Sequence, residues 1–260
     1  MLPKKFKPVF YPNSKLIRLG SIDDGGYVIP KETFKDIDKL ISYGISDNWD
    51  FEKDLSIHAK CVVDAYDYSI GKNFWIKKLK VDLIKFLKLK IFKPKKLYKM
   101  FQFIDFLYFF YFKKKNNFIL KKIGSGKNEL SFLKTVKNYE GNIFLKIDIE
   151  GSEYQILSDI VKFSNKKLIG IIIEFHDVSI NKKKIIHFID LIKNQLTLIH
   201  THGNNYSIKS IDKDPEAIEM TFINKKYLPK KNKTNNKKYP IKNLDFPNSK
   251  RSKESILRFY

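Results

Sequence analysis

The chain alternates between short apolar runs and amphipathic segments, and several apolar runs end in a glycine or an acidic residue. This alternation predicts strands separated by helices, as in an α/β domain with a mainly parallel sheet. Strands are expected at residues 39–45, 60–66, 143–147, 168–173, 197–200 and 216–224. Helices are expected at residues 50–58, 129–138, 154–163 and 185–196, with Asp50 and Ser152 as N-caps of two of them. We therefore expect a doubly wound sheet whose last two strands pair antiparallel at an edge.

Three segments outside this alternation predict additions to the sheet. Short strands at residues 16–19 and 27–29 flank a turn rich in glycine and aspartate, which predicts an N-terminal hairpin. Residues 72–122 are rich in lysine with apolar positions at mixed spacing, which predicts a helical insert or lid. Residues 228–260 are rich in lysine and asparagine and form a predicted C-terminal extension, mobile as far as about Leu244.

The second half of the insert, residues 101–112, is dominated by aromatic side chains. Three roles are open for it: a helix docked on the core, a partner surface, or a face that contacts a membrane. We favour docking or self-packing, because burial stabilises aromatic side chains most. An amphipathic membrane helix stays open as the alternative.

Composition fits a folded protein of ordinary hydropathy. With 260 residues, 43% of them apolar and 15% aromatic, the chain can form one domain of residues 1–260 with a sizeable core. The single cysteine, Cys61, excludes an intramolecular disulfide and fits a reducing compartment. No secretory pattern follows Met1, and the longest apolar run, residues 106–112, is shorter than the roughly 20 residues that span a bilayer. We expect a cytoplasmic protein, with peripheral contact at the inner membrane left open.

The net charge of +23 favours negatively charged partners such as nucleic acids or anionic membranes. However, 48 of the 51 basic residues are lysine, and Arg18, Arg251 and Arg258 are the only arginines. Lysine lacks the planar group that suits guanine edges and phosphates, and the abundant Asn, Ile and Phe are typical of a translated AT-rich genome. We therefore expect a solvated surface with loose attraction to anionic lipids or phosphorylated substrates, and no specific nucleic acid.

Acidic residues and glycines follow several predicted strands. Gly44 ends the strand at 39–45, Asp67 ends the next strand, and Asp148 and Glu150 follow the strand at 143–147. Ligands of open α/β sheets bind at the carboxyl ends of strands, so these acids are candidates for holding a substrate or cofactor. Asp64 competes with Asp67 for this role, but it lies in the middle of its predicted strand.

The stretch FLKIDIEGSEYQIL, residues 144–157, resembles the K-I-D-x-E-G-x-E box of FkbM-type S-adenosylmethionine-dependent methyltransferases. Further matches to this family include Arg18-Leu19-Gly20, Asp24-Gly25-Gly26-Tyr27, Tyr43-Gly44-Ile45, Phe51-Glu52, Ile173-Glu174-Phe175-His176, His202-Gly203-Asn204-Asn205, Glu219 with Thr221-Phe222, and Leu244-Asp245-Phe246-Pro247-Asn248. The ordered matches run from about residue 16 to 248 and leave only the insert uncovered. The subgroup most similar to this chain occurs among bacterial capsule and surface-polysaccharide genes.

This resemblance implies a Rossmann-like class I methyltransferase with S-adenosylmethionine as its cofactor. The residues that it implies for cofactor binding are Arg18, Gly26, Tyr27, Gly44, Ser46, Asp67, Tyr68 and Asp148. Within this set Gly44 would let the backbone approach the methionine part, Asp67 would bind the ribose hydroxyls, and Asp148 would face the sulfonium. The first loop departs from the usual methyltransferase pattern, because Ser42 stands where an acid is expected and Ser46 where a second glycine is expected.

Methyl transfer to a hydroxyl requires alignment of oxygen, methyl and sulfur, and a base or metal that removes the proton. The candidate catalytic residues are Asp148, Glu174, His176 and His202. The candidate substrate-binding residues are Glu150, His200, Asn204 and Asn205. A divalent metal held by Asp148, Glu174 and His202 is chemically reasonable but not favoured. Purely structural roles stay open for three of these residues. Asp148 could accept backbone N–H groups, Glu174 could pair with a lysine, and His200 could be a residue at the end of a strand.

The predicted activity is O-methyl transfer from S-adenosylmethionine to a hydroxyl of a capsular or surface polysaccharide sugar or its nucleotide-linked precursor. A phosphoryl-type capsule substituent as acceptor is a close variant. Two alternatives remain: a nucleic-acid methyltransferase, which only the charge favours, and a non-catalytic module of the same fold that docks on a membrane or glycan-assembly complex. The oligomeric state stays open, with a dimer as one option.

Overall fold

The computed structural model describes residues 1–87, 94–163, 167–206, 214–230 and 234–260. Its centre is a seven-stranded sheet with the order β5-β4-β3-β6-β7-β9-β8. The strands are β3 (Lys39–Tyr43), β4 (Val62–Tyr66), β5 (Asn117–Ile119), β6 (Ile143–Ile147), β7 (Leu168–Phe175), β8 (Leu196–Gly203) and β9 (Ile218–Asn224). The first five run parallel, and β9 runs antiparallel to both β7 and β8. The predicted mainly parallel sheet with an antiparallel pair at one edge is confirmed.

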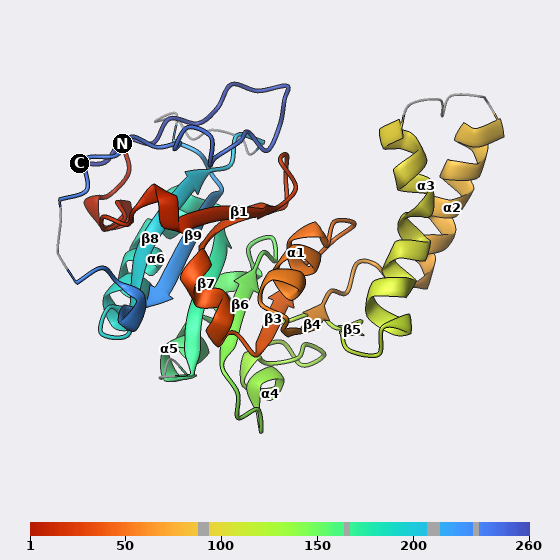
Figure 1. Cartoon of the computed structure of the whole chain (residues 1–260), viewed down its shortest axis with the longest axis horizontal. Coiled ribbons are helices and arrows are strands. Elements are labelled where there is room, and N and C mark those ends of the chain that lie inside the picture. The colour runs from red at the N-terminus through yellow and green to blue at the C-terminus, as the bar shows by residue number, and fades with distance from the viewer. Residues whose placement is uncertain (88–93, 164–166, 207–213, 231–233) are drawn as a thin grey trace.

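Both faces of this sheet are covered (Figure 1). The hairpin of β1 (Leu16–Gly20) and β2 (Gly26–Pro30) packs with α1 (Asp50–His58) on one side. On the other side α4 (Phe132–Val136), α5 (Leu157–Phe163) and α6 (Val178–Ile192) pack in a row. Because water reaches neither face, every residue of β6 and β7 is buried, which explains their continuous apolar sequences.

The helical insert projects from the β4–β5 side of the sheet (Figure 1). It consists of α2 (Lys72–Leu87) and α3 (Pro94–Leu107), and α3 continues into a π-helical turn, Tyr108–Phe112. The predicted insert is therefore helical over its described residues 72–87 and 94–112. Strand β5 lies within the predicted bounds of 72–122 but belongs to the central sheet, so those bounds are too wide.

Several predicted element ends differ from the structure. The helix expected at 129–138 is shorter, the helix expected at 154–163 begins as a 3-10 turn at Ser152, and the helix expected at 185–196 begins at Val178 and ends at Ile192. Neither predicted N-cap side chain caps its helix: Trp49 holds the cap position before Asp50, and Gly151 holds it before Ser152. The missing signal was tertiary, because packing against the sheet decides where these short helices start.

The described part of the C-terminal tail, residues 234–260, packs on the domain, whereas residues 231–233 of the stretch predicted to be mobile lie outside the described residues. In residues 234–260 Tyr239, Leu244 and Asn248 are buried, and Asn235 donates a hydrogen bond to the Pro8 carbonyl at 2.7 Å. The tail returns to the start of the chain, where the Leu2 N–H bonds the Arg258 carbonyl at 2.8 Å. Packing of a few apolar and amide side chains therefore outweighs the lysine- and asparagine-rich composition.

Candidate functional site

Two loops meet where the chain order of the sheet reverses, between β3 and β6. Gly44 follows β3 with φ +74°, and a Cβ added there would lie 1.7 Å from the Asp148 carbonyl oxygen. Only glycine allows this approach, since it has no Cβ and accepts a positive φ. Ser46 and Glu150 also have positive φ, 45° and 51°. Strained backbone of this kind is common in loops that bind ligands.

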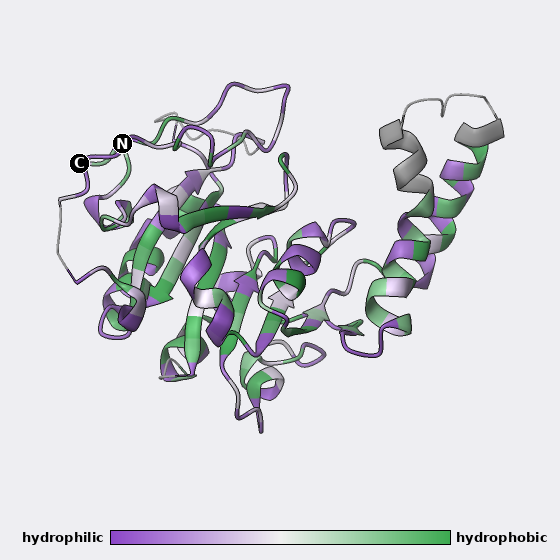
Figure 2. Cartoon of the chain, in the orientation of Figure 1, coloured by the Kyte–Doolittle hydropathy of each residue, from purple (hydrophilic) through white to green (hydrophobic). Residues whose placement is uncertain are grey.

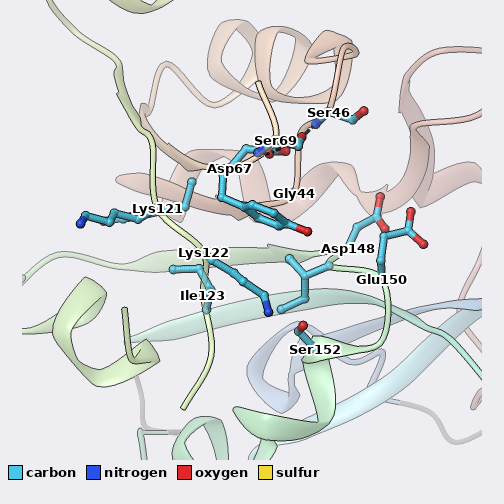
Figure 3. Close-up of a pocket in the computed structure, with 13 residues that line it drawn as sticks. Gly44, Ser46, Asp67, Ser69, Lys121, Lys122, Ile123, Asp148, Glu150 and Ser152 are labelled. Carbon is cyan, nitrogen blue, oxygen red and sulfur yellow. Dashed lines mark hydrogen bonds between the residues drawn. The ribbon is translucent and has the colours of Figure 1, made fainter. Parts of the chain in front are cut away.

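A cavity of about 410 Å³ opens between these loops (Figure 3). That volume lies within the range of about 300–1,000 Å³ typical of small-molecule sites. Three segments line it: the loop after β3, the loop after β4 with the residues after β5, and the loop after β6. The lining residues are Gly44, Ser46, Tyr66, Asp67, Tyr68, Ser69, Lys121, Lys122, Ile123, Asp148, Ile149, Glu150 and Ser152. Gly44, Asp67 and Asp148 therefore border one space, although they are far apart in the sequence.

Asp67 holds the loop after β3 rather than presenting an open carboxylate. Its Oδ2 accepts the N–H groups of Ile45 at 3.0 Å and Ser46 at 2.8 Å. Its Oδ1 accepts the N–H and hydroxyl of Ser69 at 2.7 and 2.6 Å. A carboxylate has about four acceptor sites, so these contacts occupy its capacity. The prediction that Asp67 binds ribose hydroxyls is not supported by this arrangement; Asp67 shapes the cavity wall.

Asp148 points into the site and is oriented from one side. Its Oδ2 accepts a hydrogen bond from the Tyr27 hydroxyl at 2.9 Å and lies 3.5 Å from the Lys146 Nζ. Lys146 is 3% exposed and also donates to the Gly44 carbonyl. Burial alone would lower the pKa of Lys146, but the charges of Asp148, Glu52 and Glu174 raise it, so it is charged.

Lys146 and Glu52 are site residues that the sequence interpretation did not single out. Glu52 on α1 is buried and accepts the Ser42 hydroxyl at 2.5 Å. Ser42 is the position where an acid was expected, so Glu52 supplies a carboxylate from the neighbouring helix instead. Burial, the largest cause, raises the pKa of Glu52. Both residues belong to the quoted family matches, Lys146 to the K-I-D box and Glu52 to the Phe51-Glu52 pair, and this was the available signal.

His176 joins the carboxylates at this rim. Its Nε2 lies 3.9 Å from Asp148 Oδ1, 3.4 Å from Glu150 Oε2 and 3.9 Å from Glu174 Oε1. The backbone N–H of His176 donates to Glu153 Oε1 at 2.7 Å, and the ring Nδ1 lies 3.3 Å from the same oxygen. Burial lowers the pKa of His176, but the Glu153 hydrogen bond and the nearby carboxylates outweigh it and raise the pKa to about 9. The ring is therefore protonated near neutral pH, which contradicts a role for His176 as the base.

Asp148, Glu150 and His176 also offer metal-ligand atoms within 4.8 Å of one another, in the part of the chain that the structure describes. This set differs from the predicted one of Asp148, Glu174 and His202. His202 and Glu174 line neither cavity, and the predicted set is not found among the described residues as a group with converging ligand atoms. Glu174 is buried, and burial together with the Asp148 and Glu219 charges raises its pKa well above the usual range.

A second cavity of about 90 Å³ adjoins the first on the hairpin side. Tyr27, Glu52 and Lys146 line it, and Ser46 and Asp148 line both cavities. Asp148 therefore stands between two spaces. An arrangement in which one ligand reaches each side of this carboxylate is chemically what a transfer reaction needs.

Other predicted site residues lie outside both cavities. Arg18 binds the Ser21 and Asp23 carbonyls at 3.1 Å and holds the hairpin turn, and Gly26 leaves room for the Ser21 carbonyl. Asn204 donates to Glu174 Oε1 at 2.7 Å and supports that carboxylate. Asn205 bonds backbone groups of the tail through both ends of its amide. Direct cofactor contacts of Arg18 and Gly26, and substrate contacts of Asn205, are not supported.

His200 and His202 are buried under the C-terminal tail. His200 Nε2 lies 3.0 Å from Asp245 Oδ1. His202 lies 3.2 Å from Glu219 and 3.3 Å from Glu254. Burial lowers the pKa of His202, but Glu219 and Glu254 raise it to about 10. Protonated and enclosed, His202 is unsuited to the predicted role of base. His200 is buried as well, so it is unsuited to the predicted role of substrate ligand.

No family model and no curated protein sequence matches this chain. Among solved structures, an rRNA methylase from Streptococcus thermophilus is 12% identical and has a TM-score of 0.37, with 75% of this chain and 90% of that chain covered. TrmK from M. capricolum, solved with S-adenosyl-homocysteine, is 15% identical, with coverage of 76% and 70% and a TM-score of 0.37. The fibrillarin pre-rRNA processing protein of Methanococcus jannaschii is 13% identical, with coverage of 74% and 68% and a TM-score of 0.38. At such values none of the three assigns a substrate or a residue role to this chain.

Proposed function

We propose that this protein is a class I, S-adenosylmethionine-dependent O-methyltransferase. The observation that carries the proposal is the cavity at the reversal of strand order. Gly44 and the carboxylates of Asp148 and Glu150 line this cavity. Ligands of open α/β sheets bind at this point of the topology. The sequence resemblance to FkbM-type enzymes supports the same activity from the motif that forms this border.

The residues around the cavity fit this cofactor. S-adenosylmethionine supplies a methyl group on a positively charged sulfonium, which carboxylates such as Asp148 and Glu150 attract. Tyr68, which is exposed, and Ile123 offer surface for an adenine ring at the other side of the cavity. Asp67 keeps the loop of Ile45 and Ser46 in place for the approach.

Asp148 is the residue to which we assign the proton of the acceptor hydroxyl. Tyr27 and Lys146 hold its Oδ2, so we assign the proton to Oδ1, which lies 3.9 Å from the His176 Nε2. The protonated His176 cannot accept that proton; its ring lies 3.4 Å from Glu150 and 3.9 Å from Asp148 and helps to hold these side chains in position. A positioned base of this kind contributes about 10²–10⁴-fold to a rate.

The acceptor that we propose is a hydroxyl of a capsular or surface polysaccharide sugar, or of its nucleotide-linked precursor. The support is the resemblance to the surface-polysaccharide subgroup, together with a site whose polar side chains suit hydroxyl groups. A phosphoryl-type capsule substituent remains the close variant. The net charge of +23 favours a nucleic-acid methyltransferase as second candidate.

The decisive experiment incubates the protein with methyl-labelled S-adenosylmethionine and a panel of nucleotide-sugars, and identifies the product that gains a methyl group. RNA and DNA in parallel reactions test the second candidate. Asp148→Asn, which keeps the shape of the side chain, should lose turnover, while calorimetry should still detect weakened cofactor binding because the Glu150 carboxylate remains beside the cavity. Asp159→Asn, on α5 and outside both cavities, is the matched control. Absence of any binding of S-adenosylmethionine would overturn the proposal.

A further inference from the structure

The two-helix insert has a firmly packed base and a projecting arm (Figure 1). At the base Trp75 packs on Trp49 and Phe106, with ring centroids 6.3 and 5.0 Å apart. Trp49 also donates its indole N–H to Asp105 at 2.8 Å. These contacts hold the base of the insert against the rest of the domain.

One outer face of this arm is an exposed apolar stripe along α3 and its π-helical turn. Phe101, Ile104, Tyr108 and Tyr111 follow the spacing of one helix face and are 53%, 60%, 55% and 54% exposed. Phe112, next to them, is 72% exposed. The water-facing side of a surface helix is normally polar, so this stripe, residues 101, 104, 108, 111 and 112, lacks an explanation in folding.

Helix α2 repeats the feature. Ile76, Leu79 and Leu83 stand three and four residues apart and are exposed, as is Ile84. Figure 2 shows the described parts of both helices as a mixture of strongly hydrophobic and strongly hydrophilic positions. Aliphatic side chains such as these gain nothing from base stacking but favour the interior of a lipid layer.

The charge of the insert is strongly positive. Residues 72–115 contain fourteen lysines, two aspartates and no arginine, so about half of the net charge of +23 lies in this segment. The stripe runs directly into Lys113, Lys114 and Lys115, all exposed, and the Lys113 Nζ lies 5.1 Å from the centre of the Tyr108 ring. Lysines beside aromatic and aliphatic side chains suit the boundary between headgroups and acyl chains.

We propose that this arm docks the protein on a membrane surface that contains anionic lipids. The stripe would enter the boundary region while the lysines meet the headgroups. No helix in the described residues is long and apolar enough to cross a membrane, so the arm would lie on the surface. A second copy of the chain is a poorer occupant, because the two lysine-rich segments would repel each other. Nucleic acid is poorer too, because the segment has no arginine and its aliphatic residues would stay unused.

The test measures co-sedimentation of the full chain with vesicles of phosphatidylcholine, with and without phosphatidylglycerol. We expect binding to the anionic vesicles only, falling steeply with salt. Changing Ile104, Tyr108 and Tyr111 to Ser should lower the partition coefficient at least about tenfold. Lys113, Lys114 and Lys115 changed to Gln should lower it by a similar factor and flatten the salt dependence.

The matched control changes Ile57, Ile180 and Ile256, which are exposed elsewhere on the molecule, to Ser and should bind vesicles like the parent protein. Thermal unfolding checks that each variant is folded. Equal binding to neutral and anionic vesicles, or unchanged binding of the stripe variant, would overturn the proposal. Loss of dimerisation or of RNA binding in the stripe variant, with no vesicle binding by the parent, would also overturn it. Calorimetry with S-adenosylmethionine is run on every variant. Unchanged cofactor binding in the stripe variant shows that a failure of membrane docking leaves the proposed enzyme activity untouched.

Discussion

Two clusters of histidine and carboxylate residues stand at the same end of the sheet's strands, and of these the first borders the large cavity whereas the second lines neither of the two cavities described above. The first holds His176 with Asp148 and Glu150 beside the large cavity. The second holds His202 between Glu219 and Glu254 and is buried. In both clusters carboxylates raise the pKa of the histidine, to about 9 and about 10. Similar chemistry thus appears twice, and access to solvent separates the two.

The C-terminal tail causes the difference. It places Glu254 against His202, and Asn248 donates to Glu219 at 2.8 Å. It also occupies Asn205 through the backbone of Ser249. What would be a polar rim at β8 and β9 thereby becomes part of the core. The position of a residue at the end of a strand is therefore insufficient to assign it to a site.

The largest contrast should come from neutralising one carboxylate in each cluster. Asp148→Asn should lower kcat by about 10²–10⁴-fold with a smaller loss of stability than a change in the buried cluster, because the buried Lys146 keeps Glu52 and Glu174 as neighbours. Glu219→Gln should do the reverse and lower the free energy of unfolding by about 3 kcal/mol, because His202 keeps its charge in a buried place. Labelled-methyl transfer and urea unfolding of both variants measure the two effects. Loss of activity per folded molecule in both variants would show that the clusters act together.

A second contrast concerns Asp64, within β4, and Asp67, directly after it. Asp67→Ala should weaken binding of S-adenosylmethionine about tenfold to a hundredfold, because Ile45 and Ser46 lose their acceptor and the cavity wall loosens. Asp64→Ala removes the partner of Lys39 at 2.6 Å but no wall of either cavity, so it should lower stability and spare the affinity. Calorimetric titration of the folded variants measures both. Equal affinities would contradict the assignment of Asp67 to the cavity wall.

The same contrast shows what sequence can and cannot predict. Strand β6 and helix α1 have the predicted bounds, because an apolar run and a polar break are local signals. Gly44, Asp67 and Asp148 were predicted to share a border because parallel strands end at one edge. Strand β5 was missed because three residues with one exposed asparagine give almost no periodic signal. The burial of His202 was missed because it depends on Glu254, 52 positions away, in a tail of disordered composition.

A third contrast concerns the pH dependence of stability. His202 has a pKa near 10 in the folded chain and about 6.5 when unfolded. Its contribution is therefore complete below about pH 6.5 and is lost as the pH rises through 10, with a slope of roughly 1.4 kcal/mol per pH unit. His202→Gln should remove this part of the decline between pH 7 and 10. Urea unfolding at several pH values tests this, with His187→Gln on α6 as control. Parallel pH profiles of the His202 variant and the parent would contradict the ion pairs.

The smallest expected effect is that of metal removal at the open cluster. Asp148, Glu150 and His176 have the spacing of metal ligands. However, Tyr27 and Lys146 already occupy Asp148 Oδ2, and a protonated His176 offers no lone pair to a cation. We therefore expect dialysis against EDTA to change methyl transfer by less than about twofold, the size of a small surface effect. As a control for weak metal binding, methyl transfer by the Glu150→Gln variant is measured with added Mg²⁺ or Mn²⁺. If this expectation is correct, EDTA does not abolish activity. If it does, and Mg²⁺ restores the activity of the parent but not of the Glu150→Gln variant, the open cluster is a metal centre. The two clusters would then differ in the ligand that they bind and not in their access to solvent.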